Sequence, residues 1–267
     1  MAIYTGVADA NGDFNIPFSA NYTGGQKVTV TAEKDAATKT IELFAPSSVT
    51  GGGSITFSGN LVNFPANIGI ISLESSISGQ ISNYAMQSAN NADSIFKKST
   101  GLNIKGAVTS IGQYAFYGWI NATSLVLPST LTTIMNDAFS GWGNLLSLTI
   151  PDSVTSIGEF AFSNCKKVTS LTLPNAITSI SGSAFYSFEA LPSLILPASI
   201  SSIGEYNFYG LKSCNEIVCL RATPPTLATQ VFGQLKAGCV FKVPSGSLAA
   251  YKSAPGWSAF SAQMVGV

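Results

Sequence analysis

Hydrophobic residues recur along residues 108–220 with a fixed step of 23 positions. One unit, Val154 to Pro174, reads VTSIGEFAFSNCKKVTSLTLP. Three of its slots keep the step without a slip: Ile111, Ile134, Ile157, Ile180 and Ile203; Phe116, Phe139, Phe162, Phe185 and Phe208; Pro128, Pro151, Pro174 and Pro197. An apolar set that repeats at about 20 to 50 residues is typical of a solenoid, whose units bury their hydrophobic faces only against their neighbours. The pattern therefore predicts a mainly β solenoid of 23-residue repeats.

Each repeat is predicted to contain two short strands. A VTSI strand is followed by a bend, an Ala-Phe pair that fills the core, a variable loop and a second strand that ends in LxLP. On that second strand the side chains alternate, so Leu171 and Leu173 point inwards while Ser170 and Thr172 point outwards. The array is expected to occupy residues 108–220, between a capping repeat at 81–107, which includes a short helix, and a C-terminal cap at 221–267. In that cap we expect a short helix from Leu248 to Ser253.

The first 80 residues follow a different pattern. Apolar alternation in residues 1–46, with turn signals between the runs, predicts a small antiparallel module like part of a β-sandwich. Residues 47–80 are expected to form a β connecting segment. The alternating sets are Phe14, Ile16 and Phe18; Val28, Val30 and Ala32; Ile41 and Leu43. The module resembles the second half of a bacterial immunoglobulin-like domain, which implies that the next segment or another chain completes it.

Composition limits the chemistry. The chain has 13 basic and 13 acidic residues and a formal charge of zero, so it shows no electrostatic footprint for nucleic acid. It contains no histidine, which removes every histidine-based nucleophile pair and metal ligand. No apolar stretch approaches a membrane span, and the first residues lack the pattern of a signal peptide. We therefore expect no cofactor, no membrane insertion and no enzyme activity.

Four cysteines occur in the chain. Cys165, Cys214 and Cys219 occupy slots that other repeats fill with hydrophobic residues, and Cys239 precedes a late strand. This placement favours buried free thiols. A disulfide between Cys219 and Cys239 remains the alternative.

Residues 106–267 resemble the BspA-like leucine-rich repeat family. The resemblance is carried by the unit IGxxAFxxCxxLxxLxLP, in which Ile157-Gly158, Ala161-Phe162 and Leu173-Pro174 match, and by the ending from Val243-Pro244 to Trp257. It implies a leucine-rich-repeat solenoid without catalytic residues. It also implies a bacterial surface or secreted protein that binds host proteins or other cells. The order of a small sheet module and then this array is similar to phage or prophage tail-fibre proteins.

Three surfaces are candidates for binding. Outward positions of the second strands form a short, neutral set represented by Val126, Thr149, Thr172 and Ile195. A row of hydroxyls, from Thr109 to Ser202, has the alternative role of stabilising neighbouring strands. The loops after each Ala-Phe pair carry aromatic residues that suit receptors and glycans, with core filling as the alternative: Tyr117, Trp119, Trp142, Tyr186 and Tyr209.

The expected function is non-catalytic recognition outside the cell. The first hypothesis is a tail-fibre protein on a virion that contacts a cell-surface protein or glycan through the solenoid. Residues 1–80 would then contact other tail or surface proteins. The second hypothesis is a bacterial surface or secreted adhesin. A carbohydrate-active enzyme is the third, but it needs two carboxylates across a cleft. The sequence leaves open whether the protein is a homo-oligomer.

Overall fold

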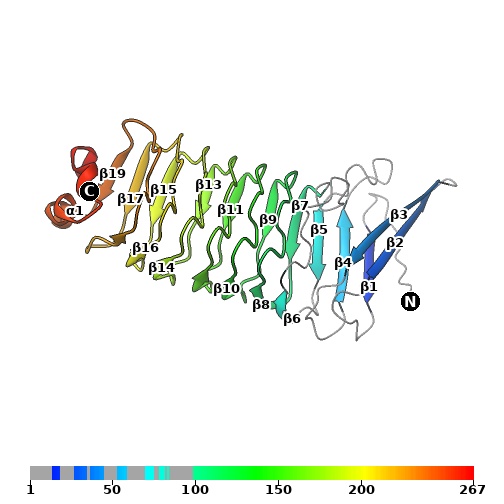
Figure 1. Cartoon of the computed structure of the whole chain (residues 1–267). Coiled ribbons are helices and arrows are strands. Elements are labelled where there is room, and N and C mark those ends of the chain that lie inside the picture. The colour runs from blue at the N-terminus through cyan, green and yellow to red at the C-terminus, as the bar shows by residue number, and fades with distance from the viewer. Residues whose placement is uncertain are drawn as a thin grey trace.

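The computed structural model describes residues 14–18, 27–34, 37–44, 53–58, 70–74, 78–81, 83 and 99–267. The chain forms an elongated stack of turns, with two rows of strands along its length (Figure 1). Nearly every turn from residue 99 onwards adds one strand to each row. The predicted mainly β solenoid is confirmed.

The first row, which we call the L ladder, carries the Leu-x-Leu motif. Its strands run parallel, and Thr149 pairs with Thr172 just as Ile195 pairs with Val218, so the sequence step is also the structural register. The members are β5 (Ile70–Glu74), β7 (Gly101–Ile104), β9 (Ser124–Val126), β11 (Ser147–Thr149), β13 (Ser170–Thr172), β15 (Ser193–Leu196), β17 (Glu216–Cys219), β19 (Val240–Val243) and β20 (Met264–Gly266).

The second row, which we call the I ladder, carries the repeated isoleucine. Ile134 pairs with Ile111 on one side and with Ile157 on the other. The members are β6 (Ser78–Ile81), β8 (Ala107–Ile111), β10 (Thr133–Ile134), β12 (Ser156–Ile157), β14 (Ser179–Ile180), β16 (Ser202–Ile203) and β18 (Thr226–Leu227).

The core between the ladders is built from stacked rings. The repeated phenylalanine forms a continuous column from Phe116 to Phe232, with successive centroids 5.3–6.1 Å apart and planes within 12° of parallel. Trp119 stacks on Trp142 at 5.3 Å. Because stacked aromatic pairs add to the free energy gained by burial, each turn stabilises the next through the same slot. This contact explains why the phenylalanine never varies among the five repeats.

The N-terminal strands extend the L ladder. β1 (Phe14–Phe18) runs antiparallel to β4 (Gly53–Ser58), which runs antiparallel to β5, and β5 pairs in parallel with β7. β2 (Lys27–Lys34) and β3 (Ala37–Phe44) form a separate antiparallel hairpin. The strands predicted in residues 1–46 are therefore present. The first of them pairs with a strand of the following segment, and the division at residue 46 stays a prediction.

The capping repeat joins the array in register, because Leu102 pairs with Leu125 one period later. The short helix expected between residues 84 and 96 lies outside the described residues. At the other end, the cap contains η3 (Ser245–Ser247), α1 (Leu248–Ser253) and η4 (Ser258–Gln263), so the helix predicted there is confirmed. No helix in the described part of the chain has the length and hydrophobicity needed to cross a bilayer.

All four cysteines are buried free thiols, as predicted. Burial raises the pKa of the Cys219 thiol to about 12. The alternative disulfide between Cys219 and Cys239 is wrong. Val218 pairs with Lys242, so Cys219 lies level with Val243, four residues along the strand from Cys239. That separation is roughly 13 Å, whereas a disulfide needs Cα atoms within about 7 Å.

Candidate binding surface

Four candidate residues lie in one row on the outward face of the L ladder: Val126 on β9, Thr149 on β11, Thr172 on β13 and Ile195 on β15. All four side chains are exposed, and Val126 and Ile195 are each 53% exposed. Their strands lie side by side (Figure 1). The outward orientation that the alternation of strand residues predicted for these four side chains is therefore confirmed.

The hydroxyls of this face are free to bind a partner. Ser147, Thr149, Ser170 and Thr172 are exposed, and none of their side chains hydrogen bonds to another group of the described structure. Serine and threonine hydroxyls each offer one donor and two acceptor positions. The face can therefore form hydrogen bonds with a partner without breaking any within the protein.

Several hydroxyls of the row beside the I ladder bond within the protein. The Thr132 hydroxyl donates to the Thr109 carbonyl at 2.9 Å, and the Ser201 hydroxyl donates to the Thr178 carbonyl at 3.0 Å. Each bond joins a turn to the one before it. These bonds support the structural role for this row, in which the hydroxyls stabilise neighbouring turns.

The outward face is neutral over four strands. The side chains that point outwards from β9 to β15 include no charged residue. Towards the C-terminal end of the ladder, charge appears at β17 and β19, where Lys242 Nζ lies 2.5 Å from Glu216 Oε2. A partner on this face therefore meets hydroxyl and methyl groups first.

The two candidate tryptophans are core residues. Trp119 and Trp142 are fully buried, and Trp142 Nε1 donates to the Phe116 carbonyl at 2.7 Å. Buried tryptophans usually satisfy their N–H in this way. Their inclusion among the ligand-binding residues is therefore corrected: both fill the core.

The candidate tyrosines present little of their ring faces. Tyr186 and Tyr209 are half-buried and stack on each other at 5.3 Å with planes 6° apart. A Cβ added at Gly233 would lie 2.4 Å from Tyr209 Cδ2, so the ring also lies against that glycine. Tyr117 packs edge-to-face with Tyr114 at 5.5 Å. A sugar therefore cannot stack on the inner faces of the Tyr186–Tyr209 pair.

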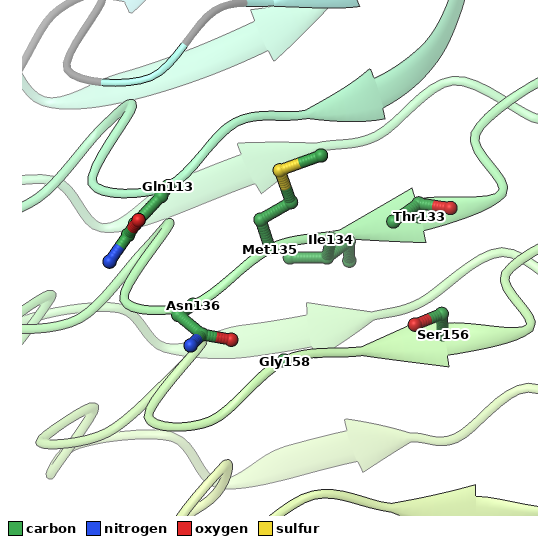
Figure 2. A pocket seen from close by; sticks show the side chains of 7 residues that line it. All are labelled: Gln113, Thr133, Ile134, Met135, Asn136, Ser156 and Gly158. Carbon is green, nitrogen blue, oxygen red and sulfur yellow. The ribbon is translucent and has the colours of Figure 1, made fainter.

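A shallow hollow of about 270 Å³ lies on the opposite side, along the I ladder (Figure 2). Met135 stands in the slot that holds glycine in three other repeats, and its side chain extends towards the preceding turn, between Gln113 and Thr133. The lining carries no charged group: Gln113, Thr133, Ile134, Met135, Asn136, Ser156 and Gly158. The hollow thus lacks the carboxylate pair that a glycosidase needs.

Two carboxylates do come together at a bend beside this hollow. Burial raises the pKa of Asp137, a hydrogen bond from Tyr114 opposes that rise, and the charge of Glu159 adds to it. The alignment of the repeats did not predict this proximity, because Asp137 and Glu159 occupy different, adjacent slots of successive repeats. Neither side chain lines the hollow. Among the described residues, no three cysteine, aspartate or glutamate side chains gather as metal ligands would.

Six copies of the BspA type leucine rich repeat region match residues 37–140 and 80–215. The chain belongs to this family. BspA-type repeats are typically non-enzymatic binding scaffolds. No curated protein matches the chain. The family match gives no support to the immunoglobulin-like resemblance or to a tail fibre.

Several solved structures are similar to this BspA-type chain. The T. pallidum leucine rich repeat protein (TpLRR) is 22% identical over 70% of this chain and 80% of that one, with a TM-score of 0.49. A leucine rich cell surface protein from Faecalibacterium prausnitzii is 21% identical over 64% and 54%, with a TM-score of 0.42. The pneumococcal vaccine antigen PcpA is 19% identical over 79% and 44%, with a TM-score of 0.38.

Proposed function

We propose that this protein is a non-catalytic adhesin, displayed on or secreted from a bacterium, that binds a protein or glycan receptor through the outward face of its L ladder. Membership of the BspA-type family supports the non-catalytic role. One observation carries the choice of surface: the outward face of the L ladder combines exposed hydroxyls on β11 and β13, which have no hydrogen-bond partner within the described structure, with the exposed hydrophobic side chains of Val126 and Ile195.

The size of the face limits the form of the partner. Four strands spaced about 4.8 Å apart, each showing about 10 Å of its length, cover roughly 200 Å². A standard protein interface buries about 800 Å² per partner. A globular receptor must therefore extend over β17 and β19, where Val218 is half-buried and Leu220 is 52% exposed. An extended glycan or peptide could lie along the row alone.

A pair of matched variants tests the surface. Replacing Thr149 and Thr172 by glutamate puts two charges in the middle of the face, and unpaired buried charges are costly in an interface. We expect the labelled full chain carrying Thr149→Glu and Thr172→Glu to lose at least about tenfold in affinity for cells that bind the unchanged protein. Saturation binding to a panel of bacterial and host cells measures the affinity.

The control carries the same charge change on the other side of the stack. Ser156→Glu and Ser179→Glu alter exposed serines of the I ladder, so binding should stay within about twofold of the unchanged protein. Equal binding by both double variants would remove the L ladder from the binding surface. Absence of saturable binding to every cell type would contradict the adhesin proposal itself.

A further inference from the structure

Cys214 and Cys239 lie together at the junction between the last repeat and the C-terminal cap. Both are completely buried. Cys214 precedes β17 and Cys239 precedes β19, which are neighbouring parallel strands of the L ladder. Their turns are joined directly beside the cysteines, because the Val240 N–H donates to the Asn215 carbonyl at 2.9 Å.

The strand register places the two cysteines almost level. Glu216 pairs with Val240, so Cys239 lies level with Asn215, one residue from Cys214, and the two thiols are close enough to shift each other's pKa. Neighbouring strands are about 4.8 Å apart, and disulfides join Cα atoms that are about 4.4–6.8 Å apart. The cysteines therefore already lie within the distance that a disulfide bridges.

The two cysteines come close together because the last turn is one residue longer than the others. The repeated phenylalanine advances by 23 residues up to Phe208, but the next one is Phe232, 24 residues on. The two cysteines are 25 residues apart, so slot counting does not align them. In the structure Cys239 nevertheless lies close to Cys214, which fills the slot of Leu191 in the repeat before.

We propose that Cys214 and Cys239 are a latent disulfide site, which closes under oxidising conditions and covalently ties the C-terminal cap to the last repeat. The site differs from the pairing that the sequence suggested, and it uses no residue of the proposed binding face. The proposal is therefore independent of what the protein binds.

The chemistry balances with a disulfide reagent as the oxidant. The thiolate of one of the two cysteines attacks one sulfur of oxidised glutathione, which releases one glutathione thiolate and leaves a mixed disulfide on that cysteine. The other cysteine then loses its proton and attacks the protein sulfur of the mixed disulfide, which releases the second glutathione. The two protein thiols give up two electrons and two protons, and the reagent takes up both to become two thiols.

A covalent tie matters most at this end of the stack. Each turn of a solenoid contacts only its neighbours, so the terminal unit is held from one side and opens first. A disulfide removes much of the entropy that the opened cap would gain. We expect the oxidised cap to be cleaved by protease at least about tenfold more slowly than the reduced cap.

The test is a peptide map of the full chain. The reduced protein is unfolded, refolded in a buffer of oxidised and reduced glutathione, and alkylated, so that burial does not limit access to the thiols. We expect the intact mass to fall by two hydrogens and one linked peptide pair to contain Cys214 and Cys239, while Cys165 and Cys219 are alkylated after unfolding.

Variants supply the control. Cys219→Ala removes another buried thiol of the same region and should still lose two hydrogens, whereas Cys214→Ala and Cys239→Ala should not. A map with four free thiols, or with any other linkage, would overturn the proposal. Because the map is made on the unchanged chain, the result stands even if a variant fails to fold.

Discussion

At the scale of single residues, the stack depends on left-handed backbone conformations at positions where the sequence has no glycine to indicate them. The same corner of each turn holds a residue in the left-handed region, with φ between 53° and 56°, and none of these residues is glycine: Tyr114, Asp137, Phe160, Ser183, Tyr206 and Gln230. The left-handed conformation costs about 1–2 kcal/mol for such residues. The conformation persists because stacking fixes each corner against the next turn.

At position 158 glycine is needed for a different reason, which is close approach to the preceding turn. A Cβ added at Gly158 would lie 2.6 Å from the Asn136 backbone nitrogen and 2.7 Å from the Met135 carbonyl carbon. We predict that Gly158→Ala lowers the free energy of unfolding by about 2 kcal/mol, because the backbone must shift. Urea denaturation followed by circular dichroism measures the change.

Gly182 is the matched control. A Cβ there would lie 3.5 Å from the Glu205 carbonyl oxygen, which is ordinary contact. Gly182→Ala should therefore change the free energy of unfolding by less than about 0.5 kcal/mol. Equal losses in the two variants would show that the spacing between turns is not the cause.

Asp137 gives a prediction of pH dependence. Burial raises its pKa, so the native state holds the proton more tightly than the unfolded chain does, and stability falls as pH rises from the ordinary aspartate range through the higher native pKa. Asp137→Asn removes this penalty. The variant should be more stable at pH 7 by less than about 1 kcal/mol, with the advantage shrinking below about pH 4.

Thermal unfolding at a series of pH values measures this effect. An advantage of the same size at every pH would show that the penalty at Asp137 is conformational and not electrostatic.

At the scale of elements, the ends of the stack are closed by different means. The N-terminal end continues into antiparallel strands, with β4 between β1 and β5. The C-terminal end is closed by α1 and η4, and the buried Tyr251 of α1 packs against the buried Trp257, which directly precedes η4, with ring centroids 5.0 Å apart. Two side-chain hydrogen bonds, from Tyr251 and Trp257, reach residues 221–225, and the one from Trp257 Nε1 reaches the buried Pro225 carbonyl at 2.7 Å.

We predict that Trp257→Phe opens the cap locally. The substitution leaves the Pro225 carbonyl buried without its donor, which costs about 1–3 kcal/mol. Hydrogen exchange should accelerate at β19 and β20 but stay unchanged at β11 and β13, because the turns of a solenoid contact only their neighbours.

Tyr251→Phe is the comparison. Tyr251 donates to the carbonyl of Arg221, a half-buried residue, so water can replace the lost hydroxyl and the effect should be smaller. Faster exchange along the whole array in the Trp257→Phe variant would contradict a local role.

At the scale of the whole molecule, the two long sides have different tasks. On the I ladder side, the Thr132 and Ser201 hydroxyls bond to the preceding turn, while the L ladder combines unbonded hydroxyls with exposed hydrophobic side chains at Val126 and Ile195. Exposed hydrophobic side chains gain free energy when a partner covers them. This combination is the reason for assigning the receptor to the L ladder.

The neutrality of that face predicts weak dependence of binding on salt. Exposed charge pairs lose strength when ionic strength rises, but hydroxyl and apolar contacts do not. Affinity for the receptor-bearing cells should change less than about threefold between about 0.05 and 0.5 M salt. A tenfold loss would place the binding site near the charged Glu216 and Lys242 instead.

The repeat pattern of the sequence was enough to predict the stack. A strict 23-residue step fixed the register of both ladders, and alternation fixed the exposure of Thr149 and Thr172, because a strand has a period of two. Three other features became visible only in the folded chain. The burial of Trp119, the proximity of Asp137 to Glu159 and the proximity of Cys214 to Cys239 all involve bends or loops. In bends and loops no fixed period relates the position of a residue in the sequence to the direction of its side chain. The last turn is also one residue longer than the others, which changes which side chains meet.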